Sequence, residues 1–185
     1  MTISKQARLI IAASAISLIG IPGVAQAQTQ GSLGATSTGS LSINASVPNR
    51  AQITGLSDIS FTNVDPTATA TNAQNLCVWS NTSTKGYNIT ATGSGTAGAF
   101  TLGSGSLPAV PYSVQWSQSS GQSSGTALTR GTALSGLVST ATRPTCNSGP
   151  ASTASLVVSI ADTALQNMTS STNYTGTLTL VVAPE

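Results

Sequence analysis

The sequence of 185 residues contains no histidine, and only 5% of its residues are charged. Without histidine, the chain lacks the side chain that most often serves as a general acid or base near neutral pH. Its four carboxylate side chains are dispersed, so none are spaced as an acid–base pair. The sequence therefore predicts no enzyme activity and no bound cofactor.

Positive charge is scarce as well, with six Lys and Arg residues in the whole chain. Two of them, Lys5 and Arg8, precede an apolar run over residues 9–21, and an Ala-Gln-Ala motif follows before Gln28. A basic start, a short apolar run and small residues at the cleavage point are typical of an export signal, and the run is too short to cross a bilayer. We expect residues 1–27 to be a signal peptide.

After removal of that signal, four cationic side chains balance four carboxylates. A nucleic-acid-binding protein needs clustered Lys and Arg to displace counterions from phosphate, and these four are scattered. The sequence thus predicts no nucleic-acid partner. So few charges also leave little electrostatic repulsion between copies of the chain, which favours self-association.

Only two cysteines are present, Cys77 and Cys146. Export favours oxidation, and two cysteines allow a single pairing. A metal or redox site is disfavoured because the chain has no histidine and no CxxC motif. The sequence predicts a disulfide that closes a loop of about 70 residues, a constraint worth on the order of 4 kcal/mol.

Short alternating apolar segments, interrupted by Gly, Ser, Asn or Pro, fill the chain from residue 53 onward. This pattern is typical of an all-β sandwich, and no helix pattern competes with it. Two of the segments, 76–80 and 87–91, are separated by a polar loop and are expected to form a β-hairpin. The other expected strands are 58–61, 100–102, 112–116, 134–138, 156–160 and 174–182.

Two segments near the ends of the exported chain have no evident partner strand. Residues 39–47, GSLSINASV, alternate so that one face carries Leu41, Ile43, Ala45 and Val47. The expected last strand, 174–182, leaves only three residues after it, so we expect a groove along its free edge. An extended segment can fill such a groove, with main-chain hydrogen bonds for affinity and alternate side chains for register.

The N-terminal segment has two possible destinations. In its own molecule it would complete a closed monomer, as an ordinary first strand. In the groove of the next molecule it would make a head-to-tail contact that repeats into a fibre. Residues 48–50, Pro-Asn-Arg, are expected to act as a hinge whose proline opposes continuation as a hairpin.

Four stretches, in this order, carry a family resemblance: SLSINASVPNRAQITGL, CVWSNTSTKGYNITATGSG, PYSVQW, and SLVVSI followed by NYTGTLTLVVAPE. The layout resembles subunits of bacterial chaperone–usher pili, especially alpha-type fimbrial subunits and secreted pilins with a spore coat protein U domain. The resemblance implies an incomplete Ig-like β-sandwich over residues 51–185. A donor strand within residues 28–50 of a neighbouring subunit would complete it.

The resemblance also implies partners and a destination. A periplasmic chaperone would hold the domain open, and an outer-membrane usher would exchange it for an identical or related subunit. The fimbria at the cell surface would serve adhesion, to a host or abiotic surface, or biofilm formation. The implied donor side chains are Leu41, Ile43, Ala45 and Val47. The implied chaperone and acceptor edge comprises Tyr174, Leu178, Leu180 and Val182, with Glu185 near the chaperone's basic anchor.

The chain departs from the family in one respect, and two other functions remain open. Many pilins place a cysteine in the first strand of the sandwich, whereas none lies between Gln28 and Leu76 here. A protective coat protein could assemble by the same strand exchange. A secreted carbohydrate-binding module is the third possibility, with a stacking platform formed by Trp79, Tyr87, Tyr112, Trp116 and Tyr174.

Overall fold

The computed structural model describes residues 28–185, and the signal peptide expected at 1–27 lies outside the described residues. The chain divides into two units, Met1–Ser46 and Val47–Glu185. In the described part of the first unit, Thr29 and Ser40 form an isolated antiparallel bridge, with N···O distances of 3.1 and 2.9 Å. The side chains of residues 28–46 are exposed.

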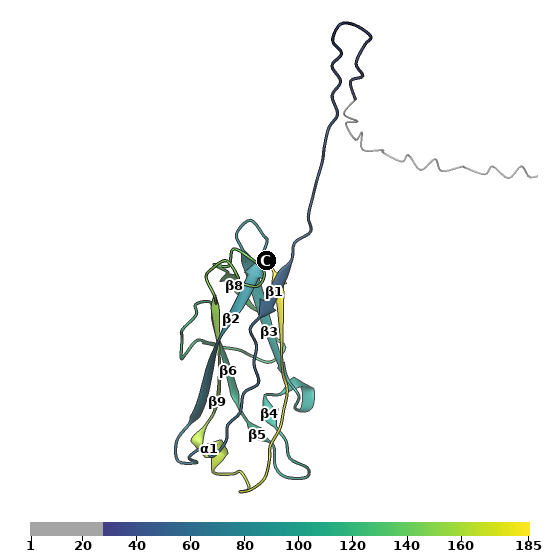
Figure 1. Cartoon of the computed structure of the whole chain (residues 1–185). Helices are drawn as coiled ribbons and strands as arrows, with labels where there is room; N and C mark the ends of the chain where they lie inside the picture. Colours follow the sequence, from purple (N-terminus) through teal and green to yellow (C-terminus); the bar gives the residue numbers. More distant parts are fainter. Residues whose placement is uncertain (1–27) are drawn as a thin grey trace, which may run out of the picture. The chain divides into compact units, whose positions relative to one another are not determined.

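The unit Val47–Glu185 is built almost entirely of antiparallel strands, which confirms the all-β prediction (Figure 1). The larger sheet has the order β1 (Ala51–Thr54), β2 (Ala70–Ser80), β9 (Ala154–Ile160), β6 (Ser113–Ser117) and β7 (Thr126–Ala127). The smaller sheet has the order β10 (Leu178–Pro184), β3 (Gly86–Gly93) and β8 (Leu134–Val138). The remaining elements are short: η1 (Thr96–Gly98), α1 (Asp162–Leu165), and the paired strands β4 (Thr101–Leu102) and β5 (Val110–Pro111). None of the helices in residues 28–185 is long and apolar enough to cross a membrane.

One continuous core lies between the two sheets. Strand β2 contributes Leu76 and Val78, and strand β3 contributes Tyr87 and Ile89, all of them buried in the same cluster. The indole Nε1–H of Trp116, on β6, donates a hydrogen bond to the hydroxyl of Tyr87 at 3.1 Å. This buried bond therefore connects the two sheets through their largest core side chains.

The β-hairpin predicted from segments 76–80 and 87–91 is wrong. Strand β2 pairs with β1 and β9, whereas β3 pairs with β10 and β8, so the polar loop crosses from one sheet to the other. The crossing lets the apolar faces of the two segments cover each other across the core, whereas a hairpin would leave both on one face of one sheet. At the crossing, Ser80 Oγ donates a hydrogen bond to the carbonyl of Gly86 at 2.8 Å.

The last strand and the first expected strand also differ from the sequence prediction. Strand β10 begins at Leu178 rather than Tyr174 and extends to Pro184. Before it, Thr175 pairs with Gly103 through backbone bonds of 2.8 and 2.9 Å. The ring of Tyr174 turns into the core, where its hydroxyl accepts a hydrogen bond from the N–H of Thr169 at 3.2 Å. Residues 58–61 form no strand.

The predicted disulfide is confirmed. Cys77 and Cys146 are bonded across a sequence separation of 69 residues. Both are buried in a small second cluster with Ala141, and Trp79 packs against it. Because Cys146 lies in the long segment between β8 and β9, the bond ties that segment to β2.

Replacing Tyr87 with Phe should destabilise the domain by about 1–3 kcal/mol, because the N–H of Trp116 would lose its buried acceptor. The matched control is Tyr112→Phe, since the Tyr112 hydroxyl has no hydrogen-bond partner among the described residues, and it should cost much less. Urea unfolding curves of the two variants provide the measurement. Equal losses of unfolding free energy in the two variants would show that the Trp116–Tyr87 hydrogen bond does not stabilise the domain.

Candidate functional site

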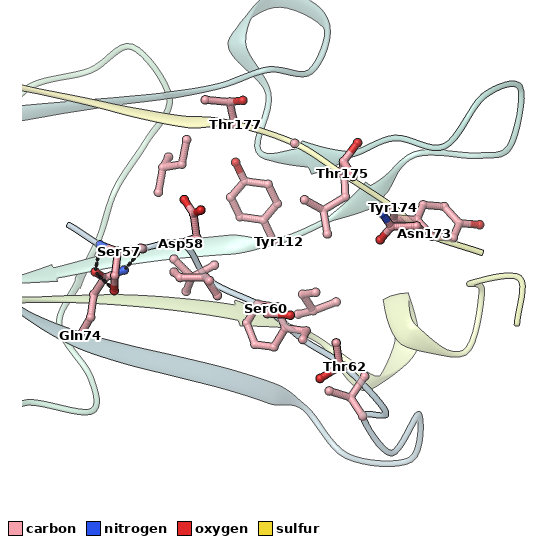
Figure 2. A pocket seen from close by; sticks show the side chains of 18 of the residues that line it. Ser57, Asp58, Ser60, Thr62, Gln74, Tyr112, Asn173, Tyr174, Thr175 and Thr177 are labelled. Atoms are coloured by element: carbon pink, nitrogen blue, oxygen red, sulfur yellow. Dashed lines mark hydrogen bonds between the residues drawn. The ribbon is translucent and has the colours of Figure 1, made fainter. Parts of the chain in front are cut away.

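A groove of about 890 Å³ lies in the unit Val47–Glu185. It lies between residues 56–64, which follow β1, and residues 172–180, which lead into and form the first part of β10 (Figure 2). Tyr112 projects between these two walls, with Asp58 on one side and Thr175 and Thr177 on the other. The groove is therefore open along the side of the molecule where the two sheets meet.

The first wall is an extended segment with almost no hydrogen bonds. Ser57 is held by Gln74 of β2, whose Oε1 accepts from the Ser57 N–H at 2.9 Å and whose Nε2 donates to the Ser57 carbonyl at 3.2 Å. Beyond it, the backbone groups of residues 58–64 form no hydrogen bond within the described chain. This wall presents a row of unpaired donors and acceptors.

A turn anchored by Asp65 ends the first wall. Its Oδ1 accepts hydrogen bonds from the N–H and the hydroxyl of Thr67, at 2.8 and 2.7 Å. These bonds favour the ionised carboxylate and lower the pKa of Asp65. Asp65 thus has a structural role, which is to stabilise this turn.

The second wall is the free edge of β10. This strand is the last in its sheet and pairs only with β3, from Leu178 opposite Gly93 to Pro184 opposite Tyr87. Leu178 and Leu180 face the groove and are only half-buried, although they pack against the core cluster. The described residues therefore cover these two side chains only in part.

The floor and the closed end of the groove are apolar. The floor is formed by β9 through Leu156, Val158 and Ile160, while Leu165 of α1 and Met168 close one end. From the first wall, Ile59, Phe61 and Val64 also face the core and are half-buried. The groove therefore suits apolar side chains of an extended segment.

Charge is nearly absent from the groove. Asp58 is the one charged residue that lines it, and it is exposed. Burial raises the pKa of Tyr112 at the floor, because the phenolate would be poorly solvated there. Within residues 28–185 there is no cluster of three or more His, Cys, Asp or Glu side chains that could hold a metal ion. The groove thus offers unpaired backbone groups and apolar side chains, with little charge.

The residues expected at the acceptor edge fall into three places. Tyr174, Leu178 and Leu180 line the groove. Val182 lines a smaller hollow of about 520 Å³, which it shares with the start of β1. Glu185 lines neither: its Oε2 accepts from the N–H of Gly136 at 2.8 Å and its own N–H donates to the carbonyl of Gly86 at 3.0 Å. The C-terminal residue is therefore bound within the chain, beside β8.

The expected donor side chains are all exposed, at 70% for Leu41, 86% for Ile43 and 81% for Val47, with Ala45 exposed as well. No strand forms over residues 39–47. Exposing three large aliphatic side chains within seven residues is unfavourable unless another surface covers them. The apolar side chains of this segment are thus left uncovered in the described structure.

Sequence reasoning missed the first wall and the floor. Residues 58–61 alternate as a strand does, and this alternation predicted a strand. The sequence signal against it was that no neighbouring segment was evident as a partner for these residues. The aromatic platform is not formed: Tyr87, Tyr112, Trp116 and Tyr174 are buried in the core cluster, which leaves Trp79 as the partly exposed member. Comparison with known proteins adds no identification, since no family model and no curated protein matches the chain.

Filling the groove should raise the pKa of Tyr112 further, because an inserted strand would remove the remaining water from its hydroxyl. A synthetic peptide of residues 39–47, added in excess, should shift the ultraviolet ionisation curve of the protein to higher pH. By linkage, peptide affinity should be constant below about pH 10 and fall as the pH rises through the pKa of the peptide-free protein. The Tyr112→Phe variant should lose the part of the shift that comes from the Tyr112 hydroxyl. An unchanged shift in that variant would show that the peptide does not cover Tyr112.

Proposed function

We propose that this chain is a structural subunit of a surface pilus that assembles by donor-strand exchange. The domain over residues 51–185 is an incomplete Ig-like sandwich, and the donor strand is residues 39–47 of a neighbouring subunit. One observation carries the proposal: on one side of the groove the backbone groups of residues 58–64 have no hydrogen bond within the described chain, and on the other side β10 pairs only with β3, so its outer edge has no partner strand. A ligand that satisfies both edges at once must itself be an extended main chain.

The length and pattern of the donor match this groove. The first wall, residues 56–64, and the donor, residues 39–47, each have nine residues, or about 30 Å of extended chain. In the donor the apolar side chains occur at every second position, so that one face meets an apolar floor and the other remains polar. Complete burial of Leu41, Ile43 and Val47 stabilises the contact by about 1.5–3 kcal/mol each before the cost of ordering the segment.

Strand donation between molecules explains the polymer. Each subunit offers its donor at one site and its groove at another, so the contact is heterologous and repeats without closing. The four carboxylates and four cations of residues 28–185 give a near-neutral surface that does not oppose close stacking of subunits. A fibre of this kind serves adhesion or biofilm formation.

The exposed groove also accounts for the partners that the family resemblance implies. Before assembly, a subunit with unpaired edges and half-buried Leu178 and Leu180 is prone to aggregate. A periplasmic chaperone that lends a strand would protect it, and an outer-membrane usher would catalyse the exchange. The protein would then pass through the periplasm to the cell surface.

Replacing Ile43 or Leu41 with Asp should abolish the polymer, because insertion would bury an unpaired carboxylate against the apolar floor. The matched control is Asn44→Asp, which adds the same charge to the opposite face of the donor strand and should leave assembly intact. The measurement is a denaturing gel of unboiled surface extract, on which strand-exchanged polymers run as a ladder. An unchanged ladder from both Leu41→Asp and Ile43→Asp would refute the proposal.

A further inference from the structure

Asn81, the residue that follows β2, binds the backbone of the hinge, residues 48–50. Its own N–H donates to the carbonyl of Arg50 at 3.1 Å. Its side-chain Oδ1 accepts from the N–H of Arg50 at 2.6 Å, and its Nδ2 donates to the carbonyl of Pro48 at 2.9 Å. The amide side chain thus acts as an additional peptide group that continues the pairing of β1 with β2 past Ala51 and Ser80.

The hinge sequence alone would favour a reverse turn. In Val47-Pro48-Asn49-Arg50, proline stands second and asparagine third, the positions that these residues prefer in β-turns. The residue types of the hinge are therefore compatible with a reversal of the chain. Yet the chain has no turn or bend between residues 47 and 50. The hydrogen bonds of Asn81 are the interactions that hold this segment in line with β1.

A donor strand that enters the groove of its own molecule must reverse direction in the hinge. The start of β1 lies beside the end of β10, since residues 49–52 and 182–184 line the same small hollow. The groove extends away from that point, along residues 56–64. Only three residues join Val47 to Ala51, a reach of about 14 Å, so the donor must lie antiparallel to β1. That path takes the Pro48 carbonyl and the Arg50 N–H away from Asn81.

We infer that Asn81 selects the partner of the donor strand: by holding the hinge extended, it directs the strand to a second copy of this chain and disfavours insertion into its own groove. The inference rests on the proposed function, since it presumes that residues 39–47 fill a groove. Asn81 is a positioning residue in this account, because it touches neither the donor strand nor the groove lining.

The test compares three variants of the exported protein, each unfolded and refolded with the disulfide intact at one fixed concentration. Asn81→Ala removes both side-chain bonds to the hinge. Asn81→Asp keeps the acceptor for Arg50 and loses the donor to Pro48. Asn49→Ala is the matched control, because the Asn49 side chain has no hydrogen bond among the described residues. Native mass spectrometry gives the ratio of monomer to oligomer, and uptake of the synthetic peptide of residues 39–47 separates closed monomers from open ones.

Asn81→Ala should raise the ratio of monomer to oligomer roughly tenfold, the shift expected for the loss of two ordinary hydrogen bonds. The additional monomer should not bind the peptide, because its groove is already filled by its own strand. Asn81→Asp should give a smaller shift, and Asn49→Ala, which removes only a residue that favours a turn, should not raise the ratio of monomer to oligomer. Circular dichroism should show the same β-sheet spectrum for all of them.

Two other results overturn the inference in distinguishable ways. If the unmodified protein forms oligomers that Ile43→Asp abolishes, but Asn81→Ala leaves the monomer ratio unchanged, the proposed function stands and the role of Asn81 is wrong. If the unmodified protein forms no such oligomers and takes up no peptide, the proposed function fails and the role of Asn81 fails with it.

Discussion

The unpaired backbone along both sides of one apolar groove is the constraint on which this structure depends. A buried N–H or C=O without a partner costs free energy comparable to a lost hydrogen bond, so sheets normally pair or cover their edges. Here the backbone groups of residues 58–64 have no hydrogen bond within the described chain, and the outer edge of β10 has no partner strand, beside the half-buried side chains of Leu178 and Leu180. In the proposed function, a donor strand would fill this groove and pair with both edges.

Other features of the chain make this groove tolerable. The crossing of β2 to β3 and the bond between Trp116 and Tyr87 hold the sheets together away from the groove. The disulfide ties the segment that carries Cys146 to β2. Because these links do not involve the groove walls, the domain can keep its fold whether the groove is empty or filled.

Period-two alternation in the sequence was sufficient to predict an all-β chain and the positions of most strands, and two cysteines in an exported chain were sufficient to predict the disulfide. It was insufficient for the pairing: residues 76–80 and 87–91 were expected to be adjacent, yet they belong to opposite sheets. Alternation indicates which side chains share one face of a strand, but it does not indicate which other strand pairs with that strand. Likewise, residues 58–61 have the alternation of a strand, yet they form none, and their backbone groups have no hydrogen bond within the described chain. The role of Asn81 was not visible at all, because it depends on contacts 31 and 33 residues away.

Hydrogen exchange of the backbone amides tests the central claim most directly. In the isolated subunit, the amides of residues 58–64 should exchange rapidly, since they have no acceptor within the described chain. In the assembled polymer, alternate amides of this wall and of the outer edge of β10 should become strongly protected together. Protection that is equal in subunit and polymer along both walls would contradict the account.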